Sequence, residues 1–199
     1  MDEYPNHLET KSVDGYTPLQ LAFSTGRANA ARMLINAGSN QTVRDRTGRN
    51  LLHLFLRSLH KSDLDLDAIR DLVQLVDPGL VSLMLTERCS DEPRSLTPIA
   101  YWMHRARRDV TYVLDSDETV TITVILLDLA ASINQKPLEM LNGAGNTPLH
   151  DAIKFQTPRT FKPLVDRRPD LLHREEATGC TPFELAVNLW TNKITSGPP

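Results

Sequence analysis

Apolar residues recur at helical spacing in short segments along the chain, and this pattern predicts several amphipathic helices. The first segment ends at Ala37-Gly38, where glycine suits the C-terminal cap of a helix. The last segment includes a β-branched run, Val120 to Val124, which by propensity favours a strand. The stripes contain Ala30, Ala31, Met33, Leu34 and Ile35, then Ile69, Leu72, Val73, Leu75 and Val76, then Ile122, Ile125, Leu126, Leu129 and Ala130.

A four-residue slot recurs five times and predicts the start of a helix each time. Proline suits the first helical turn because its missing N–H has no partner there, and a preceding Thr or Asn can cap the helix. The slots begin at Thr17, Asn50, Thr97, Thr147 and Thr181, which are 33, 47, 50 and 34 residues apart. They are Thr17-Pro18-Leu19-Gln20, Asn50-Leu51-Leu52-His53, Thr97-Pro98-Ile99-Ala100, Thr147-Pro148-Leu149-His150 and Thr181-Pro182-Phe183-Glu184.

Turn signals precede the slots, such as Asp14-Gly15, Thr47-Gly48 and Thr178-Gly179, so each unit predicts a hairpin followed by helices. With its slot, turn and second helix, the segment Asp14 to Asn40 resembles the ankyrin-repeat family, and so does Gly145 to Ala152. This resemblance implies an all-α solenoid of stacked helix-turn-helix units with short β-hairpin or loop connections. We therefore expect a single ankyrin-repeat domain over 1–199, with units at about 14–46, 47–91, 92–142 and 143–176 and a partial one at 177–195.

Departures from the family pattern are also informative. The slot histidine of the family stands only at His53 and His150, so we expect some hydrogen bonds between repeats to be missing. The longer spacings predict enlarged loops near 59–67 and 107–118. The two ends look incomplete, which predicts that the chain is a segment of a longer protein.

Composition narrows the class of function. A formal net charge of −3 argues against a dedicated nucleic-acid binder, and two separated cysteines suit a reducing, intracellular compartment, cytoplasmic or nuclear. The most apolar run, Val120 to Ile133, contains Asp128 and is shorter than the ~20 residues that span a bilayer, so we expect no membrane insertion.

No catalytic, metal or cofactor motif is present. The histidines other than His53 and His150 are scattered singly, without the short spacing of zinc ligands. Ser24 and Cys180 stand in no nucleophile motif, and no phosphate-cradling glycine loop occurs. We therefore predict a protein that is not an enzyme and has no metal or cofactor.

The ankyrin resemblance implies a partner protein bound in the concave groove formed by the hairpins and the first helices. We expect the partner to offer an acidic or amphipathic segment, because four groove arginines make the middle of the groove basic. The alternative is a targeting or regulatory segment of a larger enzyme or transcription regulator whose active part lies outside the chain. The predicted groove residues are Tyr16, Ser24, Thr25, Arg46, Arg49, Arg57, Ser58, His104, Arg105, Lys154 and Phe155.

Overall fold

The computed structural model describes residues 7–59, 66–90, 95–108, 117–133, 136–155 and 157–195. The elements that these residues form are helices, in agreement with the predicted all-α fold, and their one β-bridge joins Cys89 to Leu96. The described residues include no helix that is both long and apolar enough to cross a membrane. The helices are α1 (Pro18–Ser24), α2 (Ala28–Asn36), α3 (Leu51–Ser58), α4 (Leu66–Leu75), α5 (Pro78–Thr86), α6 (Pro98–Arg108), α7 (Asp117–Ala131), α8 (Pro148–Lys154), α9 (Pro158–Arg167) and α10 (Pro182–Thr195), with the 3₁₀ helices η2 (Lys136–Leu138) and η3 (Pro169–His173).

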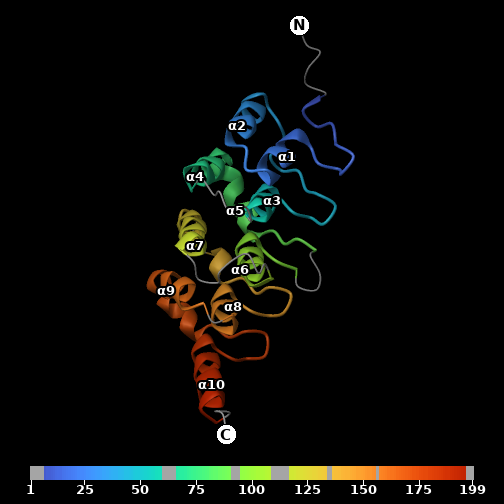
Figure 1. The fold of residues 1–199 in the computed structure, drawn as a ribbon. Coiled ribbons are helices and arrows are strands. Elements are labelled where there is room, and N and C mark those ends of the chain that lie inside the picture. The colour runs from blue at the N-terminus through green and yellow to red at the C-terminus, as the bar shows by residue number, and fades with distance from the viewer. Residues whose placement is uncertain are drawn as a thin grey trace. The chain divides into compact units, whose positions relative to one another are not determined.

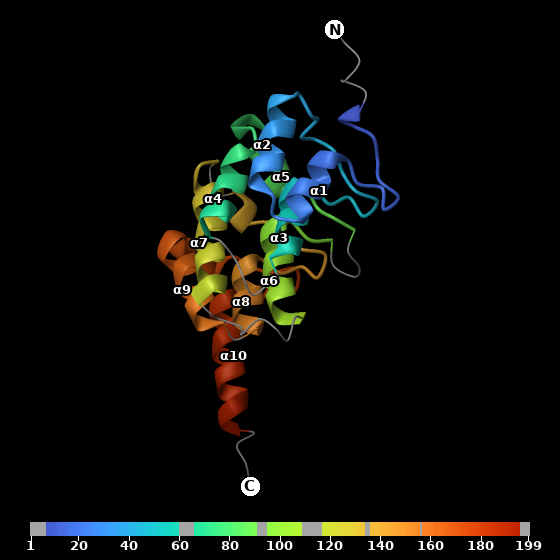
Figure 2. The ribbon, with the colours of Figure 1, turned by 45° about the horizontal axis from the view of Figure 1, so that its top comes forward.

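The chain forms two compact units, residues 1–101 and 102–199. In the first unit, α1 packs on both α2 and α3, and α2 packs on α4 in a second layer, while the turns project from the α1 and α3 side (Figure 1). In the second unit, α8 packs on α9 and α10, and α7 packs on α9. The later half of α10 extends beyond α8 and α9 (Figure 2).

Each predicted slot begins a helix through a side-chain cap, which confirms the interpretation of the sequence. Thr17 and Thr147 form complete capping boxes with Gln20 and His150. The Asn50 side chain accepts a hydrogen bond from His53 N at 3.1 Å, and the Thr97 and Thr181 hydroxyls act in the same way at their own helices. Most of these caps are buried, so they satisfy helix N–H groups that water cannot reach.

The turn before a slot has a fixed pattern of two backbone hydrogen bonds. In the first turn, Ser12 N donates to Tyr16 O and Gly15 N donates to Ser12 O, each at 2.8 Å. The turns that start at Asp45, Asn142 and Glu176 have the same two bonds. In all four, the fourth residue is a glycine with a φ near +80°, a conformation that favours glycine.

The slot histidines connect neighbouring repeats within a unit. His53 Nε2 lies 2.9 Å from Leu96 O, and His150 Nε2 lies 3.0 Å from Cys180 O, the residue directly before the next slot in each case. Gln20 occupies the same position in the first repeat, and its buried Nε2 has no hydrogen-bond partner among the described residues. This agrees with the expectation that some bonds between repeats are missing.

The structure adds one helix that the sequence did not predict and decides between helix and strand in a second region. Pro78–Thr86 forms the additional helix α5, capped by Asp77, whereas the long spacing between slots predicted enlarged loops near 59–67 and 107–118 and no further helix. The β-branched run at 120–124 lies within α7, so burial of Ile122 and Thr123 outweighs local strand propensity. Most of the expected loops near 59–67 and 107–118 lies outside the described residues.

The two glycines Gly145 and Gly179 allow a matched test of turn packing in the second unit. Their φ angles are 81° and 83°, but a Cβ on Gly145 would lie 2.3 Å from the Ala177 Cβ, whereas Gly179 faces open space. We expect Gly145→Ala to lower the free energy of unfolding by about 1–3 kcal/mol more than Gly179→Ala, because only the former adds a clash to the backbone strain. Urea denaturation of both variants measures the difference, and equal losses would contradict the close packing of these turns.

Candidate functional site

The turn surface of the first unit carries several of the predicted groove residues. Tyr16 ends the first turn, and Arg46 and Arg49 lie in the second. The Tyr16 hydroxyl accepts a hydrogen bond from Arg57 Nη1 of α3 at 3.0 Å. The Arg46 guanidinium lies over Gly15, where an added Cβ would be 3.2 Å from its Nε. The structure therefore brings Tyr16 and Arg57 into contact and places Arg46 beside the turn residue next to Tyr16.

Arg46 and Arg57 are exposed and make no ion pair within the part of the chain that the structure describes. Arg57 donates to the Tyr16 hydroxyl, and no described carboxylate lies close enough to pair with its positive charge. Since an arginine offers five N–H groups in a planar fork, both side chains can still bind a carboxylate. We call Tyr16, Arg46 and Arg57 the turn cluster.

Arg49 has a different environment. Its side chain is only 13% exposed, its Nη1 lies 3.4 Å from Asp45 Oδ2, and its guanidinium carbon lies 5.8 Å from the centre of the Tyr101 ring. The carboxylate and the ring both compensate its charge. Arg49 therefore stabilises its own turn, and it offers a partner less than Arg46 does.

The predicted hydroxyl residues bond to their own helices. Ser24 Oγ and Thr25 Oγ1 donate to Leu21 O at 3.0 and 2.8 Å, and Ser58 Oγ donates to Phe55 O at 2.7 Å. These bonds satisfy carbonyls near the ends of α1 and α3. Each hydroxyl oxygen keeps acceptor capacity, so the three residues could contribute secondary polar contacts.

The predicted residues of the second unit are less available. His104 and Phe155 are only 7% and 9% exposed, and their rings pack edge to face with 5.0 Å between the ring centres. Neither is as exposed as the repeat pattern predicted. Lys154 is bound on both sides, to Asn146 Oδ1 at 2.6 Å and Glu176 Oε2 at 2.8 Å. The side chain of Arg105 lies outside the described residues.

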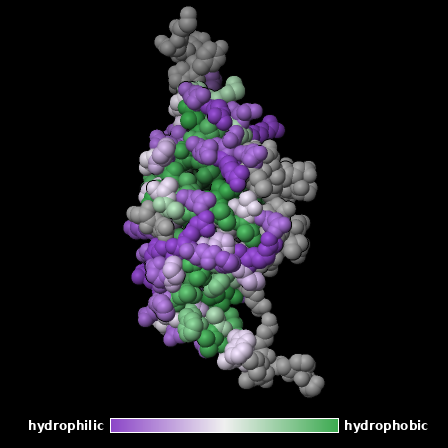
Figure 3. Space-filling view, turned by 90° about the vertical axis from the view of Figure 1, so that its left-hand side faces the viewer, coloured by the Kyte–Doolittle hydropathy of each residue, from purple (hydrophilic) through white to green (hydrophobic). Residues whose placement is uncertain are grey.

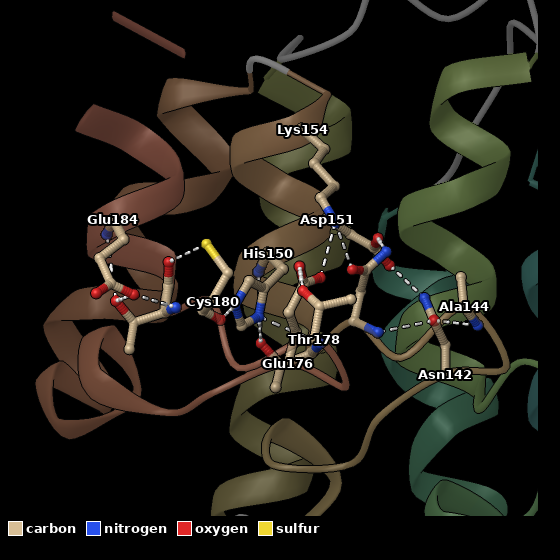
Figure 4. Close-up of polar contacts among 12 residues, drawn as sticks. Asn142, Ala144, His150, Asp151, Lys154, Glu176, Thr178, Cys180 and Glu184 are labelled. Atoms are coloured by element: carbon tan, nitrogen blue, oxygen red, sulfur yellow. Dashed lines mark hydrogen bonds and ion pairs between the residues drawn. The ribbon is translucent and has the colours of Figure 1, made fainter. Parts of the chain in front are cut away.

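Beneath Lys154 lies a buried polar network that the sequence analysis missed. Asp151 is fully buried and accepts hydrogen bonds from Asn142 Nδ2 at 2.9 Å and Asn146 Nδ2 at 3.2 Å (Figure 4). His104 Nε2 also lies 3.3 Å from Asp151 Oδ2. Because a buried carboxylate is costly without such partners, this network holds the 142–146 turn against α8. The sequence signal for this network was Asn142. It stands at the first position of its turn, which Asp45 occupies in another repeat.

Comparison with known proteins gives a family for one segment. Residues 14–46 match the model of the ankyrin repeat. The chain contains an ankyrin repeat. The matched segment includes α1, α2 and the turn-cluster residues Tyr16 and Arg46.

Solved structures share the fold. A chain from the complex of the predatory endopeptidase Bd0816 of Bdellovibrio bacteriovorus with immunity protein Bd3460 is similar at a TM-score of 0.61. The match covers 93% of this chain and 80% of that chain at 16% identity, so it concerns the fold alone. No curated protein matches the chain.

The described residues hold no group of three or more His, Cys, Asp or Glu side chains that could bind a metal ion.

Burial raises the pKa of the Cys180 thiol, and the charges of Glu176 and Glu184 raise it further. Cys180 is therefore a poor nucleophile at neutral pH, because the thiolate is the reactive form. The Ser24 hydroxyl, in the ankyrin repeat, donates a hydrogen bond to the backbone carbonyl of Leu21 and not to a side-chain base.

His150 makes the stability of the second unit depend on pH. Burial lowers the pKa of its imidazole below the ordinary value of 6.5, although its bond to Cys180 O opposes this shift. The unfolded chain therefore binds the proton at a higher pH than the folded chain does. The contribution to stability is complete above about pH 6.5 and falls as the pH drops toward the lower folded pKa.

His150→Gln removes this titration but can keep the capping box, since the Gln20 side chain accepts from Thr17 N at 2.9 Å in the same slot. We expect the variant to lose less stability than the parent chain between about pH 7 and about pH 5, measured by urea denaturation. His173→Gln, at an exposed histidine, is the control and should behave like the parent. An unchanged pH dependence in His150→Gln would show that other groups cause the acid destabilisation.

Proposed function

We propose that this chain is a non-enzymatic protein-binding module and that the turn cluster of the first unit binds an acidic segment of its partner. The observation that carries the proposal is the pair of exposed arginines, Arg46 and Arg57, whose charges have no acidic partner among the described residues. The ankyrin match over 14–46 supports protein binding as the kind of function, because this family typically binds proteins through its turns and first helices.

Three features of the turn cluster favour a carboxylate ligand. Tyr16 accepts from Arg57, so its own O–H can still donate to a partner. Arg46 lies over Gly15, where a glycine with a φ of 84° leaves room for the guanidinium close to the backbone. Because both arginines are exposed, each such contact with a carboxylate contributes only about 0.2–1 kcal/mol, so the two arginines are needed together. The overall charge of −3 shows that the cluster is a local basic feature and not part of a generally basic protein.

The second unit offers a contrast that limits where the acidic segment would bind. In that unit, Lys154 stands at the position that Arg57 holds in its own repeat. Glu176 Oε2 lies 2.8 Å from Lys154 Nζ and neutralises its charge. A partner carboxylate would have to displace Glu176 to use Lys154. We therefore place the main contact on the first unit.

Charge reversal at the cluster tests the proposal. We expect the double variant Arg46→Glu with Arg57→Glu to bind a fluorescent glutamate-rich peptide about tenfold or more weakly than the parent, because two attractive contacts become repulsive. Fluorescence anisotropy measures the affinity, and a glutamine-rich peptide of the same length gives the background. Arg49 is left intact because it stabilises its turn through Asp45.

The matched control is the double variant Arg27→Glu with Arg174→Glu, which changes the net charge equally at exposed positions outside the turn cluster. This control should keep the parent affinity if the turn cluster is the binding site. Equal weakening in both double variants would reject the site and indicate a general charge effect. Steeply salt-dependent retention on a DNA column would instead favour nucleic acid as the ligand.

A further inference from the structure

Helix α10 exposes apolar side chains that the corresponding helices bury. The third residue of the slot is fully buried in α1, α3 and α8, as Leu19, Leu52 and Leu149 show, whereas Phe183 in α10 is 57% exposed. Leu149 lies in α8, on which α10 itself packs. The face of α10 thus repeats a packing surface but lacks the helix that would cover it among the described residues.

The exposure continues along the helix. Val187, Leu189 and Trp190 are 42%, 40% and 67% exposed, and every residue from Ala186 to Thr191 is exposed. Figure 2 shows this half of α10 extending past α8 and α9, and hydrophobic surface is visible near the C-terminal end of the chain in Figure 3. An exposed helical segment with little packing is marginal in water, so a contact on this face would also stabilise the helix.

We infer that α10 is a self-association surface on which a second copy of this chain packs its own α10 in the antiparallel direction. Phe183, Val187, Trp190 and position 194 are spaced by four, three and four residues, which is the seam of a two-helix coiled coil. A twofold axis between Asn188 and Leu189 places Val187 opposite the partner's Trp190, so a large side chain meets a smaller one.

Charge favours the antiparallel direction. Glu184 lies in the first turn of α10 and Lys193 in its last turn. Antiparallel packing sets the acidic end of one helix beside the basic end of the other, and it also opposes the two helix dipoles. Parallel packing would bring the two Glu184 side chains to the same end of the pair.

The available area predicts a weak dimer. Aromatic side chains offer about 150–250 Å² each, so the exposed parts of Phe183 and Trp190 together provide roughly 250 Å² per copy. With Val187 and Leu189 from both copies, the apolar contact reaches roughly 750 Å², and a polar rim brings the total near the lower limit of about 1,200 Å² for specific interfaces. Self-association should therefore appear only at high protein concentration.

Sedimentation equilibrium of the 199-residue chain, from about 10 µM to about 1 mM, tests this inference. We expect the mass to rise from 22.3 kDa toward twice that value as concentration increases. Trp190→Glu should weaken the association at least about tenfold, because it places a charge in the centre of the seam. Met33→Lys, at a 73% exposed apolar residue of α2, is the matched control and should leave it unchanged.

Two further measurements distinguish this face from another interface. Of the two tryptophans, Trp102 is fully buried, so a concentration-dependent blue shift of the emission would come from Trp190. Lys193→Glu should weaken the dimer about two- to fivefold at low salt, whereas Lys11→Glu should have no effect.

A constant mass of one chain at all concentrations would overturn the inference and leave the α10 face to a different protein or to another helix pair. A dimer that Trp190→Glu does not weaken would also overturn it, since the contact would then lie elsewhere. The proposed binding of acidic segments is independent of both outcomes, because its residues belong to the first unit.

Discussion

The side-chain cap at the start of each first helix is the interaction on which the rest of the structure depends. The caps at Thr17, Asn50, Thr97 and Thr147 are almost completely buried, so their helix N–H groups have no access to water and need an internal partner. A Thr or Asn cap is typically worth about 1 kcal/mol, but its larger effect is geometric. It fixes the direction in which each turn leaves its helix, and therefore the position of every turn side chain.

The slot residue extends this constraint from one repeat to the next. His53 and His150 each bond a cap residue with one ring nitrogen and the following repeat with the other. The same imidazole thus orients its own helix and the next turn. Gln20 keeps the cap, but its Nε2 finds no partner in the described part of the chain, so the first repeat has one connection fewer to its neighbour there. The turn cluster lies in this less constrained part of the first unit.

The two turn surfaces show how similar backbones can serve different purposes. Among the described residues, the first unit offers Arg46 and Arg57 no acidic partner, while the second unit joins its turns through Lys154, Asn146 and Glu176. Below the second surface, Asp151 and its two asparagines add a buried network. One unit is therefore suited to receive a charged ligand, and the other to hold its own turns together.

The start of each first helix, its cap and the glycine of each turn could be predicted from the sequence, because they rest on interactions within a few residues. The same local logic placed Tyr16, Arg46 and Arg57 on the turn surface. Local patterns could not predict α5, the contact of Arg49 with the Tyr101 ring, or the burial of His104 and Phe155. Those features depend on residues distant in the chain, such as Tyr101 for Arg49 and Asp151 for His104, and only tertiary packing brings these together. Tertiary packing also decided which apolar faces are covered, as the contrast between buried Leu149 and exposed Phe183 in equivalent slots shows.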